Sequence, residues 1–214
     1  MLSRSAPRLC PLTTLMLLAL LLEIAPAQQA GQSPPARPVP EAPFGLQWGM
    51  SADQVRGLGV SLTEIPADEN GTQFRATDLP KTVSDLETTV LSFGFHDGLW
   101  RVASVSETFE NDPYGLKVRT RYEELQKVLA NKYGQPVEHH HQDTELWKDR
   151  DEFLAGISAG RSWHFSSFDS TPISVQLSIR ASALNDAYYV VIFKDSREED
   201  RVKADNKRAE EDAF

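Results

Sequence analysis

The chain has almost no capacity for thiol chemistry, because its 214 residues include a single cysteine, Cys10. It is also short of basic residues, with 22 Lys and Arg against 31 Asp and Glu and a formal net charge of −9 at pH 7. Binding to phosphate backbones needs clustered Lys and Arg. The charge balance therefore argues against a nucleic-acid partner, and in the same way against binding to anionic membrane surfaces.

Local catalytic motifs are missing from the sequence as well. It contains no G-x-S-x-G corner, no S-x-x-K, no H-E-x-x-H and no P-loop. Ser162 and His164 lie two residues apart on a predicted strand, but no third group is identifiable that would orient them. We therefore expect a protein that is not an enzyme, and no cofactor is predicted.

The one long apolar run lies at the N-terminus. Arg4 and Arg8 precede apolar residues 12–22, and Ala25-Pro26-Ala27 follows with small side chains at a cleavage site. This order is typical of a secretory signal peptide, and the run is shorter than the roughly 20 residues that a membrane span needs. We expect cleavage near Ala27 and a periplasmic or secreted protein with no membrane span. An uncleaved anchor is the alternative.

Composition divides the remainder into three parts. Residues 28–43 contain five prolines and are predicted to form a semi-extended tether. Residues 196–214 carry seven acids and five bases, which predicts either a frayed helix or a disordered charged tail. Residues 44–195 have the length of one domain. Cys10 would leave with the signal peptide, so this domain has neither a thiol nor a cysteine that could be lipidated.

Two helices are predicted. Residues 116–133 repeat apolar side chains every three or four positions, which defines one buried stripe, and Gly134 and Pro136 then end the helix. That stripe consists of Val118, Tyr122, Leu125, Val128, Leu129 and Tyr133. A shorter helix begins after Ser51, whose side chain can form a capping box with Gln54. Residues 44–48 before it alternate and predict a short strand.

Hairpin signals and alternating segments predict the strands. Asn70-Gly71 and Asp97-Gly98 favour tight turns, and the second lies between strand-forming residues 89–95 and 99–105. Residues 161–168, 173–179 and 188–193 predict a late meander in which the last strand is the most buried. The fold class is therefore α+β, an antiparallel sheet of several strands covered on one face by two main helices. The order of elements hints at a degenerate two-fold repeat, although no residue-level repeat supports it.

The corner Phe44-Gly45-Leu46-Gln47-Trp48-Gly49-Met50-Ser51 resembles a signature of small secreted bacterial proteins of unknown function. Those proteins also carry a helix ending in L-x-x-x-Y-G-x-P, similar to residues 129–136, which include Tyr133 and Gly134. The layout is similar to the α+β modules of β-lactamase inhibitor proteins and outer-membrane assembly lipoproteins. The resemblance implies architectural roles for these motif residues: Trp48 packs, Gly49 permits the turn and Ser51 caps the helix.

The most conspicuous polar cluster is His139-His140-His141, followed by Asp143 and Glu145. Imidazoles and carboxylates are good Zn²⁺ and Cu²⁺ ligands, and alternate residues such as His139 and His141 point the same way on a strand. His139, His141 and Asp143 are therefore candidate metal ligands. The cluster is expected in a loop between a helix end and the next element, so a solvated polar loop without a metal is the alternative.

Two functions follow as expectations. The first is a non-catalytic periplasmic module that binds another envelope protein, either as an inhibitor or immunity protein of an envelope-acting enzyme or as an assembly factor. Inhibitors of basic enzymes are often acidic, because complementary charge speeds encounter. The second is a metal-binding or hydrolytic protein that uses the cluster at His139 and His141.

Overall fold

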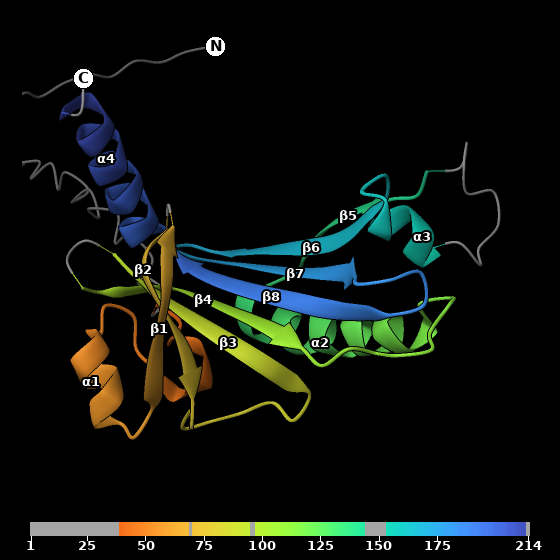
Figure 1. The fold of residues 1–214 in the computed structure, drawn as a ribbon, viewed down its shortest axis with the longest axis horizontal. Coiled ribbons are helices and arrows are strands. Elements are labelled where there is room, and N and C mark those ends of the chain that lie inside the picture. Colours follow the sequence, from red (N-terminus) through yellow and green to blue (C-terminus); the bar gives the residue numbers. More distant parts are fainter. Residues whose placement is uncertain (1–38, 69, 95–96, 144–152, 213–214) are drawn as a thin grey trace, which may run out of the picture. The chain divides into compact units, whose positions relative to one another are not determined.

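A computed structural model describes residues 39–68, 70–94, 97–143 and 153–212. These residues form one open antiparallel sheet of eight strands with four helices (Figure 1), which confirms the α+β class. The predicted signal peptide and most of the predicted tether lie outside the described residues. Within the described part, no helix has both the length and the apolar character that crossing a bilayer requires.

The elements follow one another along the chain in a simple order. A 3-10 turn at Pro43–Gly45 precedes the first helix. The helices are α1 (Ala52–Gly57), α2 (Leu116–Tyr133), α3 (Phe153–Ser158) and α4 (Ser196–Asp212). The strands are β1 (Ser61–Asp68), β2 (Gly71–Thr77), β3 (Leu86–Phe93), β4 (Leu99–Ser106), β5 (Val137–His141), β6 (Trp163–Ser170), β7 (Ile173–Ala181) and β8 (Ala187–Asp195).

The sheet is built from two similar halves. Its strand order is β1-β2-β3-β4-β8-β7-β6-β5, so each half is a helix followed by a four-stranded antiparallel meander. The last strand of each meander, β4 or β8, pairs antiparallel with the other at the centre of the sheet. The topology therefore repeats with two-fold character at the level of elements, and α3 is an insertion in the second half only.

Helices α1 and α2 lie on the same face of the sheet. The guanidinium of Arg56 in α1 lies 5.3 Å from the ring centroid of Phe74, and Tyr133 in α2 packs against Phe193 with ring centroids 5.9 Å apart. Phe74 and Phe193 share one face, because the register connects them through Leu91 and Val102. The prediction of two helices on one face is confirmed, with α2 beneath strands β6–β8 in Figure 1.

The hydrophobic core lies between these helices and the sheet. Its fully buried members include Leu91, Val102, Leu177 and Tyr122. An ion pair connects α2 to the segment before β3: Arg121 donates to both carboxylate oxygens of Asp85, at 2.7 and 3.0 Å. The guanidinium of Arg121 holds the pKa of Asp85 below its usual range.

The corner at residues 44–51 differs from its prediction in one respect. Residues 44–48 are not a strand: Pro43–Gly45 forms a 3-10 turn, and Phe44 and Gly45 have φ angles of 62° and 82°. The positive angles turn the chain before any ladder can form. Trp48 donates from its indole Nε1 to the carbonyl oxygen of Pro40 at 3.2 Å.

The predicted capping box at the start of α1 is present. Ser51 Oγ accepts from the amide of Gln54 at 3.2 Å, and the Gln54 side chain accepts from the amide of Ser51 at 2.8 Å. Gly49, at φ 80°, donates its amide to the carbonyl oxygen of Leu99. The bond of Gly49 joins the corner to β4 and the bonds of Ser51 cap α1, so both residues have architectural roles here.

Helix α2 has the predicted bounds, and Gly134 ends it at φ 94°. Val128 is an exception to the predicted stripe, since it is 63% exposed while Leu129 beside it is 9% exposed. Neighbouring positions on a helix lie about 100° apart, so only one of the two can face the sheet. Strand β8, which contains the segment predicted to be the most buried strand, lies at the centre of the sheet. Its side chains nevertheless alternate between buried and partly exposed, so only one of its faces is fully buried.

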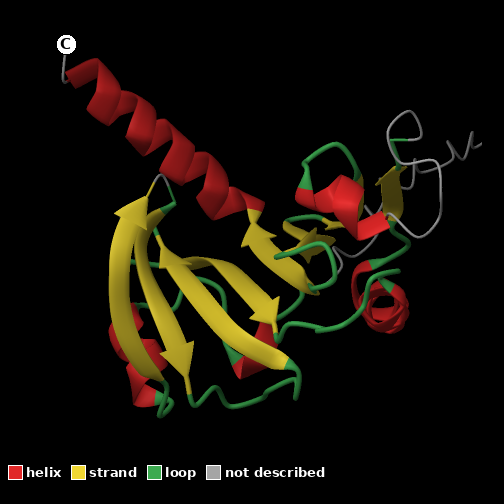
Figure 2. Ribbon diagram, turned by 45° about the vertical axis from the view of Figure 1, so that its right-hand side comes forward, coloured by secondary structure: helices red, strands yellow, loops and turns green. Residues whose placement is uncertain are grey.

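Three further segments were not predicted or were left open. Residues 137–141, expected in a loop, form the edge strand β5, and residues 153–158 form α3. The charged C-terminal segment is a helix, α4, which leads away from the sheet (Figure 2) and buries Val202 against it. Ala42 and Pro43, assigned to the tether, are buried and belong to the domain.

Candidate functional site

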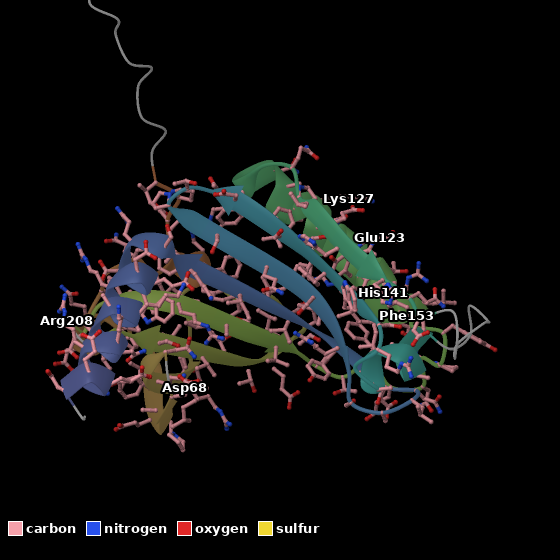
Figure 3. All side chains as sticks on the ribbon, turned by 90° about the horizontal axis from the view of Figure 1, so that it is seen from above. Asp68, Glu123, Lys127, His141, Phe153 and Arg208 are labelled. Carbon is pink, nitrogen blue, oxygen red and sulfur yellow. The ribbon has the colours of Figure 1, made fainter. Side chains whose placement is uncertain are left out.

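The face of the sheet opposite α1 and α2 is the candidate functional site, and we call it the uncovered face. Figure 3 views the sheet from this side, with α4 at one end. Its residues follow from the strand register, because directly paired residues point to the same side. The middle row across the sheet is Thr63, Arg75, Val90, Ala103, Ile192, Gln176, Ser167 and Val137.

Two neighbouring rows belong to the same face. The row toward α4 runs through Ile65, Gln73, Ser92, Arg101, Lys194, Ser174 and Asp169. The row on the other side includes Val105, Val190, Ser178, Phe165 and His139. Beyond it, Tyr188 pairs with Arg180, and Trp163 pairs with His141.

The centre of the uncovered face is apolar. We call its five side chains the apolar belt: Val90, Ala103, Val105, Val190 and Ile192, all partly exposed. An antiparallel sheet with one solvated face usually alternates apolar and polar residues, and exposed apolar patches often mark interaction sites. Helix α4 approaches this face at the end near Lys194.

A ladder of stacked rings forms the β5–β6 end of the sheet. Each of the three histidines of β5 stacks on the residue opposite: His139 on Phe165 at 4.5 Å, His140 on His164 at 3.6 Å and His141 on Trp163 at 4.2 Å between ring centroids. Cross-strand aromatic pairs stabilise sheets by roughly 0.2–1 kcal/mol each. Histidine has no strong preference for strands, so these stacks explain why residues 137–141 form the strand β5.

The outer two stacks lie on the uncovered face. Trp163 is 47% exposed and Val137, at the start of β5, is 61% exposed. Strand β5 is the edge of the sheet, so its outward backbone groups face no other described strand. This end of the face therefore offers aromatic surface and an open strand edge together.

The middle stack lies on the covered face, under α2 and α3. His164 meets Tyr122 and Phe153 edge-on at 4.8 and 5.7 Å. Burial, together with the nearby His140 and Arg119, lowers the pKa of His164 to about 4. His164 is therefore neutral near pH 7.

A hydrogen-bonded group of side chains lies beside it. Tyr122 donates to Ser166 Oγ at 2.6 Å, and Gln126 donates to the same oxygen at 2.8 Å. Burial raises the pKa of Tyr122 to about 12. Ser166 is completely buried, so its hydroxyl joins α2 to β6 and is not reachable by a substrate.

The structure does not assemble the three predicted metal ligands. His139 is within 3.1 Å of Ser167 Oγ, whereas the carboxylate of Asp143 is buried and binds Arg161 at 2.6 Å. Ser162, the weak nucleophile candidate, accepts from the amide of Asp143, and no hydrogen bond joins it to an imidazole within the described residues. Within the described ranges, no group of three or more His, Cys, Asp or Glu is placed to hold a metal ion.

A hollow of about 300 Å³ lies on the uncovered face between α4 and strands β5–β8. Its floor contains Gln176 and Ile192 of the middle row, and Val137 lies at its outer edge. Lys194 and Glu199 form its wall with an ion pair of 3.0 Å. Lys194 and Lys203 hold the pKa of Glu199 below its usual value despite burial, which raises it.

Sequence reasoning missed the uncovered face because the face exists only once the register is known. One signal was available: Trp163 and Phe165 alternate with polar residues, which places two aromatic rings on one side of a predicted strand. Comparisons with protein-family models, with curated proteins and with solved structures find no match to this chain. The resemblance at residues 44–51 and 129–136 therefore stays a prediction.

Proposed function

We propose that this chain is an exported protein-binding module and that it binds its partner through the uncovered face. The observation that carries the proposal is the apolar belt, which crosses the sheet centre on the side that neither α1 nor α2 covers. Burying such a belt against a partner removes apolar surface from water, and this favours association to the extent that it exceeds the freedom lost on binding.

The surroundings of the belt fit a protein interface better than a small-molecule pocket. Interfaces combine an apolar centre with a polar rim, and Trp, Tyr and Arg are enriched where binding energy concentrates. Here the belt is flanked by Tyr188, Trp163, Arg75 and Arg180. An export signal, absent catalytic motifs and a scaffold-like corner in the sequence agree with this proposal.

Affinity capture with a matched pair of variants tests it. Ala103 points outward from the middle of the belt, so Ala103→Arg places a bulky cation in the proposed interface. Lys127→Glu changes an exposed residue of α2 on the covered side (Figure 3) and serves as the control. Thermal melting of each variant establishes that it is folded.

The wild-type chain and Lys127→Glu should capture the same envelope protein in stoichiometric amount, and Ala103→Arg should lose it. Equal capture by all three would contradict the role of the uncovered face. Turnover of an ester, glycan or phosphate substrate without any captured partner would contradict the function itself.

The metal-binding alternative rests on two imidazoles, His139 and His141, on one side of an edge strand. Its test is metal analysis of untagged, dialysed protein together with melting in added Zn²⁺ and Cu²⁺. Stoichiometric metal that is lost in His139→Ala would support it, and sub-stoichiometric metal with no change in melting would remove it.

A further inference from the structure

The charge on the uncovered face is opposite to the charge of the whole chain. The rows that the strand register places there contain four basic residues, Arg75, Arg101, Arg180 and Lys194, and two acidic residues, Asp169 and Asp68. Asp68 pairs with Gly71 at the end of β1, and its carboxylate accepts from the side-chain amide of Gln73. The whole chain has a formal net charge of −9. Basic side chains therefore outnumber acidic ones in these rows, whereas acidic residues are in excess over the whole chain.

Two of the cations have no counter-ion within the described residues. Lys194 is neutralised by Glu199, and Arg101 contacts Ser92 Oγ at 3.4 Å. Arg75 and Arg180 are exposed and make no hydrogen bond or ion pair in the described part of the chain. Asp169 forms no ion pair with either arginine within the described residues, and its carboxylate accepts from the amide and hydroxyl of Thr171.

The two free arginines lie on opposite sides of the apolar belt. Arg75 lies beside Val90 in the middle row, and Arg180 lies beside Tyr188 at the other end of the belt. Four strand spacings separate β2 from β7 in the sheet order, which is roughly 19 Å across the strands. Guanidinium groups bind carboxylates in bidentate geometry, so each is a ready donor for an Asp or Glu of a partner.

We propose that the partner presents an apolar segment flanked by Asp or Glu side chains, which contact Arg75 and Arg180 while the segment covers the belt. This inference rests on the proposed function, since it names the chemistry of the partner for that face. A second copy docked face to face is disfavoured, because it would oppose arginines to arginines. A basic partner, expected from the acidic composition alone, would meet like charge at this face.

Selection of peptides from a random phage-displayed library on the immobilised full-length mature chain tests the inference. The charge-reversed variant is Arg75→Glu with Arg180→Glu. Lys127→Glu with Lys132→Glu on α2 is the control, because it changes the net charge by the same amount at exposed positions of the covered side. Ala103→Arg reports whether a peptide binds at the belt.

The expected result is enrichment of peptides that combine Asp or Glu with Leu, Ile, Val or Phe. These peptides should bind the control like the wild type, and the Arg75→Glu, Arg180→Glu variant at least about tenfold more weakly. Enriched peptides that are neutral or basic, or acidic peptides that bind the charge-reversed variant equally well, would overturn the inference.

The same selection separates this inference from the proposed function. Peptides that lose binding in Ala103→Arg but lack acidic residues would leave the binding face in place and remove only the acidic partner. A selection that enriches no peptide, or only peptides indifferent to Ala103→Arg, would contradict both.

Discussion

Gly49 and Gly71 both have left-handed backbone angles, with φ of 80° and 89°, but their surroundings differ. A Cβ at position 49 would meet nothing within 4 Å, whereas a Cβ at position 71 would lie 2.4 Å from the carbonyl oxygen of Phe93. Substitution at Gly49 therefore adds backbone strain alone, and substitution at Gly71 adds a collision with β3.

Gly49→Ala should lower the free energy of unfolding by about 1–2 kcal/mol, the cost of a side chain in the left-handed region. Gly71→Ala should cost clearly more. Gly57→Ala is the control, because Gly57 lies in α1 with open space around it, and alanine is favoured there by about 0.5–1 kcal/mol. Urea denaturation measures all three, and equal losses at positions 49 and 71 would contradict the packing at the β2–β3 pair.

His164 makes stability depend on pH. Its folded pKa of about 4 lies below the ordinary value of 6.5, so the unfolded chain binds more protons between these values. Stability should be complete above pH 6.5 and should fall as the pH drops toward 4, with a slope of at most about 1.4 kcal/mol per pH unit for one proton.

Urea denaturation across that pH interval measures this slope, and His164→Phe should flatten it. Asp85 acts in a separate range, because its lowered pKa keeps its contribution until the pH falls below the usual carboxyl range. A slope unchanged by His164→Phe would show that the imidazole is not buried as described.

At the scale of elements, the orientation of α2 decides which of its apolar residues contribute to stability. Leu129→Ala removes a buried side chain between α2 and the sheet and should lower the free energy of unfolding by about 2–5 kcal/mol. Val128→Ala, one position earlier and 63% exposed, should cost less than about 0.5 kcal/mol. Denaturant midpoints distinguish the two, and a larger loss at Val128 would mean that α2 is rotated.

Helix α4 is attached to the sheet through the side chain of Val202, which is 3% exposed, and through the ion pair of Glu199 with Lys194. Pairs of charged residues three or four positions apart lie along the helix itself. Val202→Asp should release α4 and speed amide hydrogen exchange in Ser196–Asp212, while strands β6–β8 keep their protection. Val202→Ile is the matched control. Loss of protection throughout the sheet would show that α4 is part of the core.

The elements that sequence could predict are those with strong local signals. The stripe of α2, its stop at Gly134, the Ser51 capping box and the Asp97-Gly98 hairpin all depend on residues close together in the chain. Strand β5 was missed, because its stability depends on stacking against Trp163, His164 and Phe165, more than 20 positions away. The prediction of a strand at residues 44–48 was wrong, because the alternating pattern there does not reveal a turn with positive φ angles.

At the scale of the whole molecule, the uncovered face could not be predicted. Each of its rows consists of residues from different strands, and only the register shows which of them lie side by side. Val90, Ala103 and Ile192 come from three separate strands and appear in the sequence as unrelated apolar positions. Net charge was also a poor guide to this surface, since the acidic total conceals the basic side chains that gather there.

Site-specific photo-crosslinking in the producing cells tests the central claim most directly. A photoreactive residue replaces Ala103 in the apolar belt in one variant and Lys127 on α2 in the other, and both variants are checked by melting. The account predicts one discrete crosslinked envelope protein from position 103 and none from position 127. Crosslinks from position 127 with none from position 103 would contradict a binding role for the uncovered face.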